Sequence, residues 1–398
     1  MSQPAASHRA VVAIVYRYIH QYRREFYDRL RDRLAAADVE LRLVAGEPGP
    51  EDVSKGDAIE VPWARRIKNV VFPFGQREIY WQPVLSHVRD ADLVIVEQAS
   101  KLLVNYVLLA GRRLGGPRVA FWGQGLNVYQ HRASPVGEAI KRVMSRRVDW
   151  WFAYNEMSLD VVLGLGFPPE RITCVQNAID THALREARAG VGAAELDTAR
   201  RMIGVSSANV GVYAGALYAD KRIDFLIAAS DLVRKTVPDY ELVIIGSGSD
   251  EHTAREAAVT RPWLHVLGAR FGREKVHIMA LAKALLLPGL VGLGILDGFA
   301  LELPLVTTSG PYHGHEIDYL DPGENGLMVK DWRDPREYAD AIVAVMTDDD
   351  LLERLRSGCR DARERYTVET MVERFANGVL LALSAPRGNG SWALEAHQ

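Results

Sequence analysis

The stretch from Pro288 to Thr308, PGLVGLGILDGFALELPLVTT, joins two apolar strand-like runs through a glycine-bearing turn and a short helical segment. A glycine-rich turn that leads into a helix exposes main-chain N–H groups and the positive end of the helix dipole, which suits a phosphate or another anion. Asp297 lies within this helix, where its carboxylate can reach a ligand held at the helix start. His315 and Glu316 follow the next strand end, in the run SGPYHGHE. Glycines can serve only to close a tight connection, but polar residues at two successive strand ends favour a ligand crevice.

The elements that must position these residues alternate along the chain. Apolar runs of strand length are followed by helical patterns, which is typical of parallel α/β layers. We expect strands at Ala10–Tyr16, Val39–Ala45, Leu93–Glu97, Arg118–Trp122, Trp150–Tyr154, Val210–Ala214, Leu242–Ile245, His265–Leu267, Ala284–Leu287, Leu303–Thr308 and Gly326–Val329. Helices fill the intervals, including one expected at Tyr80–Val88, and the strand pattern stops between residues 180 and 207.

The chain of 398 residues is longer than one ordinary core requires, so two domains are expected. The predicted fold class is α/β, with two facing doubly wound Rossmann-like domains and a ligand cleft between them. The predicted boundaries are residues 1–190 and 191–365, followed by a helix at 366–385 that crosses back to the first domain. Residues 386–398 are expected to form a flexible tail.

Composition excludes several classes of protein. A hydrophobic content of 48% and a charged content of 25% are those of a globular protein, and no apolar run approaches membrane-span length. Two cysteines argue against a disulfide framework and a thiolate metal site. Residues 1–200 carry 27 Lys and Arg against 23 Asp and Glu, whereas residues 201–398 carry 21 against 28. The basic half could approach anionic lipid or an acidic acceptor, although a mixed solvated surface explains the same counts.

No secretory segment precedes the first strand-like run, so a cytoplasmic protein is expected, with contact of the first domain at the inner face of the membrane left open. Nothing in the sequence resembles a dedicated nucleic-acid module, and no nucleic-acid partner is expected.

Several ordered blocks resemble the group 1 (family 4) nucleotide-sugar-dependent glycosyltransferases, which have the two-domain GT-B fold. In the second half these blocks are YAGALYADKRIDFLIAAS, ELVIIGSGSDE, HVLGARFGRE, the glycine turn described above and HGHEIDYLDPGENGLMV. In the first half IHQYRREFYDRL, AFWGQGLN, VDWWFAYN and ITCVQNAID resemble the acceptor domain of members that act on cell-surface polysaccharides. The resemblance implies an N-terminal acceptor-binding domain and a C-terminal nucleotide-sugar-binding domain.

Transfer of the family's motif residues exposes departures. The second glutamate of its carboxylate pair falls on Asp297, and the first falls on Gly289, so any role of that carboxylate toward the donor sugar is missing. The phosphate-binding lysine falls on Lys221, and the arginine that usually precedes it is replaced, with Ala216 as the nearest match. The histidine of the first domain is replaced by Gln124. The imidazoles that remain without an assigned role are those of His20, His131 and His315.

The resemblance implies that Lys221 and the turn at Leu290–Gly292 stabilise the charge that develops on the leaving diphosphate. It also implies that Asp297 holds the ribose and that the base packs near Ala269–Arg270. Neither a metal nor a cofactor is implied, because the nucleoside diphosphate sugar is a co-substrate. The expected catalytic residues are Lys221, Gly292 and Asp297. The expected donor-binding residues are Gly215, Lys221, Gly246, Arg270, Gly289, Leu290, Val291, Gly292, Asp297 and Glu316. The expected acceptor-binding residues are Arg17, Tyr22, Arg23 and Gln124, and the acceptor is a glycan, a lipid-linked sugar or a small molecule.

The resemblance implies transfer of the sugar with retention of its anomeric configuration, and three other classes of protein compete with this interpretation. A dehydrogenase needs G-x-G-x-x-G after its first strand, and Gly246-Ser247-Gly248 lacks the third glycine. A nucleotide-sugar epimerase of the same fold would share the donor site but need no acceptor. A catalytically inactive nucleotide-sugar-binding partner also stays open, because of Gly289, Ala216 and Gln124.

Overall fold

The computed structural model describes residues 9–49, 58–74, 77–126 and 135–388. Its described residues form two compact units. The first contains the described residues up to Ile179 together with those from Val368 onward, and the second contains Asp180–Thr367. The sequence placed this boundary after residue 190, which is eleven residues later and just past the first helix of the second unit, His182–Ala189.

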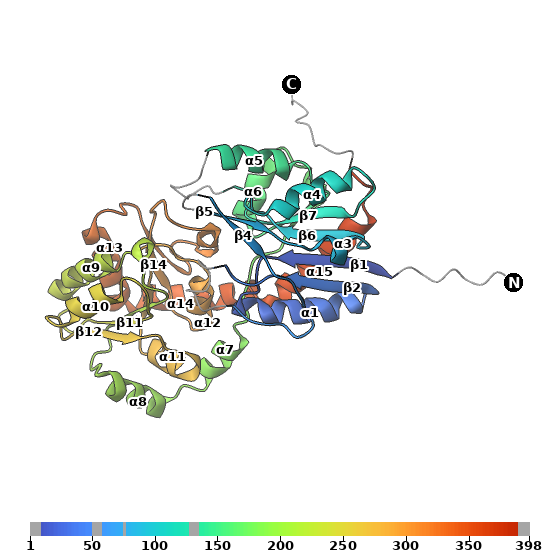
Figure 1. Ribbon diagram of the computed structural model, residues 1–398. Helices are drawn as coiled ribbons and strands as arrows, with labels where there is room; N and C mark the ends of the chain where they lie inside the picture. The colour runs from blue at the N-terminus through green and yellow to red at the C-terminus, as the bar shows by residue number, and fades with distance from the viewer. Residues whose placement is uncertain (1–8, 50–57, 75–76, 127–134, 389–398) are drawn as a thin grey trace, which may run out of the picture. The chain divides into compact units, whose positions relative to one another are not determined.

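The first unit is built on a seven-stranded sheet in the order β3-β2-β1-β6-β7-β8-β9, in which every neighbouring pair is parallel. The strands are β1 (Ala10–Tyr16), β2 (Val39–Ala45), β3 (Arg65–Arg66), β6 (Leu93–Glu97), β7 (Arg118–Gly123), β8 (Trp150–Ala153) and β9 (Ile172–Cys174). A strand of a parallel sheet is covered on both faces, and the apolar sequence of β1 and of the first four residues of β6 matches this environment. The helices are α1 (Arg24–Ala35), α3 (Leu85–Val88), α4 (Leu103–Arg112), α5 (Pro135–Ser145) and α6 (Glu156–Gly164) (Figure 1).

A β-hairpin replaces most of the helix expected at Tyr80–Val88. Strands β4 (Val70–Phe74) and β5 (Arg77–Trp81) pair in antiparallel fashion, and only Leu85–Val88 is helical. Pro83 separates the strand from the helix, because proline cannot donate the main-chain hydrogen bond that a continuous helix needs.

The second unit has a six-stranded sheet in the order β12-β11-β10-β13-β14-β15, again parallel throughout. The strands are β10 (Val210–Ala214), β11 (Glu241–Ile245), β12 (Leu264–Gly268), β13 (Ala284–Leu286), β14 (Leu305–Thr308) and β15 (Gly326–Val329). The helices are α7 (His182–Ala189), α8 (Ala193–Ile203), α9 (Ile223–Thr236), α10 (Glu251–Ala258), α11 (Gly272–Met279), α12 (Gly294–Ala300), α13 (Pro335–Thr347) and α14 (Asp349–Arg365). The stretch at 180–207 that was expected to hold no strand is therefore filled by two helices, α7 and α8.

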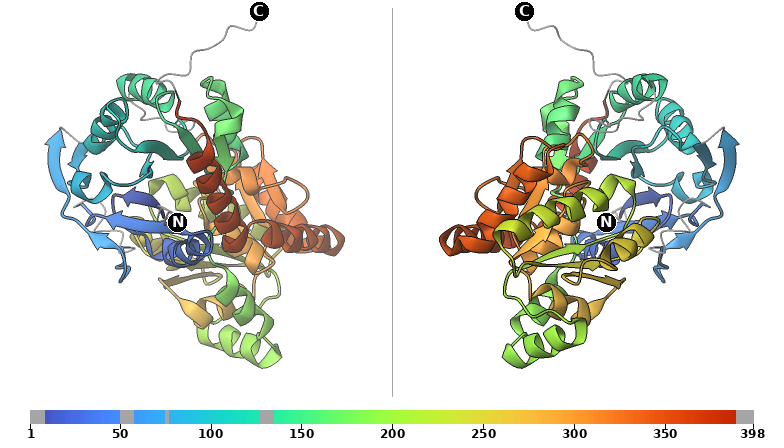
Figure 2. Two further views of the ribbon diagram at one scale, coloured as in Figure 1. Left: turned by 90° about the vertical axis from the view of Figure 1, so that its right-hand side faces the viewer. Right: turned by 90° about the vertical axis from the view of Figure 1, so that its left-hand side faces the viewer.

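Helix α15 (Val368–Ser384) returns the end of the chain to the first unit, where it packs along α1 (Figures 1 and 2). The ring of Phe375 stacks on Phe152 of β8 with centroids 4.3 Å apart. Gly378 allows this approach, since an added Cβ would lie 2.4 Å from Oγ1 of Thr173 on β9. The burial of an aromatic ring and the close helix–sheet contact make α15 an integral layer of the first unit.

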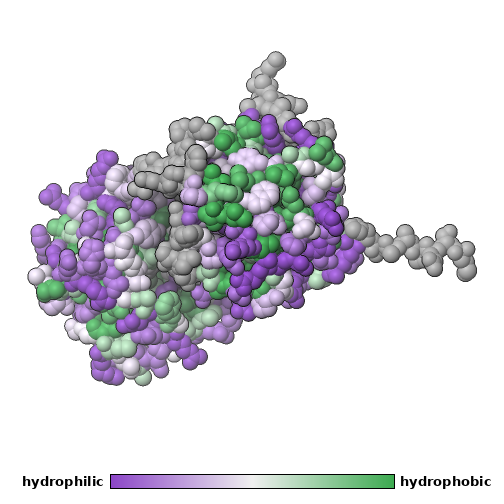
Figure 3. Space-filling view, in the orientation of Figure 1, coloured by the Kyte–Doolittle hydropathy of each residue, from purple (hydrophilic) through white to green (hydrophobic). Residues whose placement is uncertain are grey.

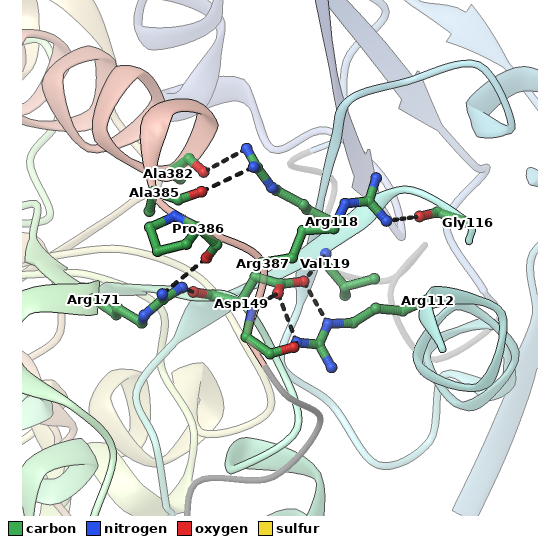
Figure 4. A network of polar contacts seen from close by, with 11 residues as sticks. Arg112, Gly116, Arg118, Val119, Asp149, Arg171, Ala382, Ala385, Pro386 and Arg387 are labelled. Atoms are coloured by element: carbon green, nitrogen blue, oxygen red, sulfur yellow. Dashed lines mark hydrogen bonds and ion pairs between the residues drawn. The ribbon is translucent and has the colours of Figure 1, made fainter. Parts of the chain in front are cut away.

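Three arginines then hold the last turn of α15 and the residues that follow it (Figure 4). Arg118 donates hydrogen bonds to the main-chain oxygens of Ala382 and Ala385, Arg171 to that of Pro386, and Arg112 to that of Gly388. Arg112 also forms a buried ion pair with Asp149, with Nε 2.5 Å from Oδ2. Cationic groups beside the carbonyl groups at a helix C-terminus are favourable because of the helix dipole. Of the tail expected at 386–398, residues 389–398 lie outside the described residues.

Candidate functional site

Two loops meet at one edge of the second sheet. Strands β10 and β13 are parallel neighbours, so the loops that follow them lie at the same edge. The N–H of Leu290 donates to the main-chain oxygen of Asp220 over 2.9 Å. A Cβ on Gly289 would lie 2.0 Å from that same oxygen, so only glycine fits this approach. The absence of a carboxylate at position 289 therefore has a structural cause, the contact between these two loops.

Lys221 lies where the loops after β10 and β13 meet. Its ammonium donates a hydrogen bond to the main-chain oxygen of Leu290 and lies 5.6 Å from the centre of the Tyr218 ring. Burial lowers the pKa of Lys221 to about 8, and the nearby carboxylates of Glu316 and Asp220 partly oppose this shift. A desolvated cation next to a glycine turn is suited to an anionic ligand, because ligand charge would replace the lost hydration.

The loop after β14 supplies the third side of the site. The hydroxyls of Thr307 and Thr308 donate to the main-chain oxygens of Leu287 and Pro288, over 2.7 and 2.9 Å. The imidazole of His313 lies 2.6 Å from the main-chain oxygen of Thr308 through Nε2. Because that oxygen only accepts, Nε2 carries the proton, and burial lowers the pKa of His313. These hydrogen bonds fix the turn from Pro288 onward against β14.

Glu316 lies in the short 3₁₀ helix His315–Tyr319 and is close enough to Lys221 to affect its pKa. The roles of Thr308, at the end of β14, and of His313, in the loop after it, were not expected from the sequence, because single threonine and histidine residues carry no distinctive spacing. His315, one of the unassigned imidazoles, is buried in the same 3₁₀ helix.

Asp297 lies in α12 and already has a partner. Nζ of Lys275, from α11, is 2.8 Å from Oδ2 of Asp297, and both side chains are partly exposed. Lys275 was not singled out in the sequence, since it lies 22 residues from Asp297 without a motif to connect them. The two residues form a charged pair that a ligand hydroxyl can approach on the carboxylate side.

The other residues expected to bind the donor lie beside the junction of the β10 and β13 loops or at the ends of neighbouring strands. Gly246 packs against Gly215, since an added Cβ would lie 1.8 Å from the main-chain oxygen of Gly215. Arg270 is half-buried and pairs with Glu274, with Nε 3.0 Å from the carboxylate. Val291 and Gly292 occupy the turn between Leu290 and α12. The second unit thus gathers the β10 and β13 loops, Lys221 and Glu316 at one sheet edge.

The four residues expected to bind an acceptor all belong to the first unit, and the structure gives them different environments. Arg23 is 1% exposed; its guanidinium donates to Oδ1 of Asn177 and lies 5.0 Å from the centre of the Trp122 ring. It is therefore part of the interior of the unit and has no access to an acceptor in this structure, so we remove it from the acceptor site.

Tyr22 is exposed and stacks on His20 with ring centroids 5.2 Å apart. The guanidinium of Arg17 lies 5.2 Å from the centre of the Tyr18 ring, and Gln124 is half-buried at the end of β7. His131 lies outside the described residues.

Within the described ranges, no group of three His, Cys, Asp or Glu side chains is arranged to hold a metal ion. No helix in this part of the chain is both long and apolar enough to span a bilayer.

Residues 208–348 match the family model described as group 1 glycosyl transferases. The matched residues all lie within the second unit, Asp180–Thr367. The chain is also similar to an alpha-D-kanosaminyltransferase from Streptomyces kanamyceticus, with 27% identity over 169 residues. That match covers 39% of this chain and 41% of the relative, so it spans less than half of the relative's length.

Solved structures show the fold over a longer range. Anabaena HepE in complex with UDP-glucose is similar with a TM-score of 0.67 and 14% identity, over 93% of this chain and 99% of that one. Sucrose-phosphate synthase from Thermosynechococcus elongatus is similar with a TM-score of 0.67 and 15% identity, over 95% and 100%. These likenesses, together with the two parallel sheets, confirm the predicted α/β fold of GT-B type and the predicted family resemblance.

Proposed function

We propose that the chain is a glycosyltransferase that moves a sugar from a nucleoside diphosphate sugar to an acceptor hydroxyl. The observation that carries this proposal is the position of Lys221, whose ammonium bonds the Leu290 carbonyl in the glycine turn of a group 1 glycosyltransferase domain. The complexes of HepE with UDP and with UDP-glucose make UDP the first nucleotide to test on this chain.

In the proposed reaction the bond between the sugar and the diphosphate breaks, and negative charge develops on the leaving diphosphate. Lys221 stabilises that charge from a desolvated position, where an ion contact is stronger than in water. Asp297 accepts hydrogen bonds from the ribose, with Lys275 holding the carboxylate in place. The acceptor hydroxyl forms the new glycosidic bond, and its proton passes to an oxygen of the leaving diphosphate.

Transfer with retention of configuration, without a metal, is the form of the reaction that we propose. The acceptor class we propose is a glycan, a lipid-linked sugar or a small molecule, bound through the first unit near Tyr22, Arg17 and Gln124. A nucleotide-sugar epimerase is not favoured, because the family model and the curated relative are both transferases.

The test is product analysis with a panel of nucleoside diphosphate sugars, with and without candidate acceptors. A glycosylated acceptor whose anomeric configuration matches that of the donor supports the proposal. A free epimer of the donor would identify the epimerase, and nucleotide binding without any turnover would identify an inactive partner. A product of inverted configuration would keep the transferase and contradict retention.

A further inference from the structure

Helix α4 exposes an apolar stripe to solvent. Leu103, Val107, Ala110 and Leu114 are spaced by four, three and four residues, so they share one side of the helix and its following turn. All of them are exposed, and Leu114 is 88% exposed. The opposite side of α4 is buried in the core of the first unit, as the full burial of Val104 shows. Helix α4 is therefore apolar on both its inner and its outer side, and the inner side alone is explained by the fold.

The β4–β5 hairpin extends this apolar surface. Val70 and Phe72 are 44% and 47% exposed, and the residues directly opposite them on β5 are Trp81 and Ile79, which are also apolar. Tyr80, which points to the other side of the hairpin, is fully buried and donates its N–H to the main-chain oxygen of Lys101 over 2.8 Å. That bond joins the hairpin to the start of α4. Figure 3 shows apolar residues gathered over α4 and the hairpin.

The segment that contains this surface is strongly basic. Residues 65–147 carry 14 Lys and Arg against five Asp and Glu, although the whole chain has a net charge of −3. Helix α5, in the same segment, exposes Ile140 and Val143 beside Arg142 and Arg147. Of the few acids, Glu138 pairs with Lys141, with the oxygen and nitrogen 3.0 Å apart. The exposed apolar side chains thus lie in a segment with an excess of positive charge. Lys68 and Arg113, close in sequence to Val70 and Leu114, are exposed, whereas Arg112 is buried against Asp149.

We propose that this face, formed by Val70, Phe72, Leu103, Val107 and Leu114 with the basic residues around it, docks on an anionic lipid bilayer. A bilayer of this kind offers both components that the face requires, an apolar interior just below a negatively charged surface. A second copy of the chain does not, because a symmetric contact through this face would bring two basic surfaces together. Docking would bring the first unit, the acceptor domain of the proposed function, to a surface where lipid-linked acceptors reside.

The test is co-sedimentation of the full chain with vesicles of phosphatidylcholine alone and of phosphatidylcholine with about 30% phosphatidylglycerol, at low and high salt. We expect binding to the anionic vesicles only, weakened by salt. The variant V107E/L114E should lose roughly tenfold or more in vesicle affinity, because it places charge where the apolar side chains would enter the bilayer. The matched control is V259E, since Val259 is 85% exposed in the second unit, and it should bind as the parent chain does.

Circular dichroism confirms that each variant is folded, and light scattering after gel filtration reports the oligomeric state. Failure of the parent chain to bind anionic vesicles would overturn the proposal. So would equal binding to neutral vesicles, equal loss in V259E, or a dimer that V107E/L114E dissociates. Binding of UDP is measured for the same variants. UDP binding without vesicle binding would overturn the membrane proposal alone, and vesicle binding without UDP binding would contradict the proposed donor site alone.

Discussion

Lys275 and Asp297 form an ion pair between neighbouring helices of the second unit, with Nζ 2.8 Å from Oδ2. The carboxylate proposed to hold the donor ribose is thereby oriented before any ligand arrives. A carboxylate with one oxygen bonded to a lysine keeps its other lone pairs for hydroxyl donors. Asp297 is therefore a preorganised hydrogen-bond acceptor.

We expect Asp297→Asn to weaken the binding of UDP itself by roughly tenfold, because a charge-assisted hydrogen bond becomes a neutral one. Lys275→Met should weaken UDP binding less, since the carboxylate remains but loses its fixed orientation. Isothermal titration calorimetry measures both, and Asp340→Asn, an exposed acid on α13, is the control. An unchanged dissociation constant for Asp297→Asn would remove this residue from the donor site.

Lys221→Ala should lower donor affinity or transfer rate by about 10- to 100-fold, which corresponds to the loss of a charge-assisted contact of roughly 1.5–3 kcal/mol. Lys235→Ala, at the exposed end of α9, should leave both quantities unchanged. Steady-state kinetics with varied donor concentration make the comparison. Wild-type kinetics in the Lys221 variant would show that the lysine serves the loop contact with Leu290 alone.

The lowered pKa of Lys221 predicts proton uptake when a diphosphate binds. At pH 8 about half of the free protein carries a neutral Lys221, and an anionic ligand restores the charged form, so binding should take up about half a proton per site. Donor affinity should then fall as the pH rises above 8. Calorimetric titration in buffers of different ionisation enthalpy counts the protons, and Lys221→Met should abolish the uptake. The same uptake in that variant would assign it to another group.

The lowered pKa of Lys221 also affects the stability of the protein. Donor affinity should fall as the pH rises above 8, whereas stability without ligand should rise. The unfolded lysine has its ordinary pKa of 10.5, so between about pH 8 and 10.5 the unfolded chain binds more protons than the folded one. The contribution of Lys221 to the free energy of unfolding therefore increases as the pH rises through this window. Without ligand, the free energy of unfolding of the parent chain should therefore increase relative to that of Lys221→Met as the pH rises from about 8 to 10.5, as measured by denaturant titration.

Gly289→Ala should destabilise the second unit by about 1–3 kcal/mol, since the new Cβ would lie 2.0 Å from the Asp220 oxygen and the two loops would have to separate. Gly294→Ala is the matched control, because its Cβ would meet Leu287 at an ordinary 3.8 Å. Differential scanning calorimetry compares the two variants. Equal stability of both would mean that the contact between the β10 and β13 loops is loose.

Arg23→Met should lower the stability of the first unit by about 1–3 kcal/mol, because it removes the buried charge-assisted hydrogen bond from Arg23 to the side-chain oxygen of Asn177. Binding of UDP should stay unchanged, since the proposed donor site lies in the other unit. Arg24→Met, on the exposed neighbour, should be neutral in both measurements. A large loss of acceptor turnover in Arg23→Met at full stability would return Arg23 to the acceptor site.

The sequence was sufficient for most of the sheet strands and for the turn from Pro288, because long apolar runs and glycine spacing are local signals. Strands β3 and β9 were not expected, since two and three residues are too short to give such a signal. The helix expected at Tyr80–Val88 was wrong, since the apolar residues of β5 serve a hairpin whose partner strand lies earlier in the chain. Arg23 was expected in the acceptor site because it lies among aromatic and basic residues after the first strand. Its burial depends on Trp122 and Asn177, which are distant in sequence. The pairing of Lys275 with Asp297 is hidden for the same reason.

The return of α15 to the first unit sets an order of events during synthesis. The second unit runs without interruption from Asp180 to Thr367, so all of it has been synthesised before Phe375 exists to cover Phe152. The first unit, although translated first, cannot complete its core until the last helix is released. A nascent chain of this protein therefore carries an unfinished N-terminal half throughout translation, and a stop codon shortly before α15 would damage the beginning of the protein more than the part next to the break.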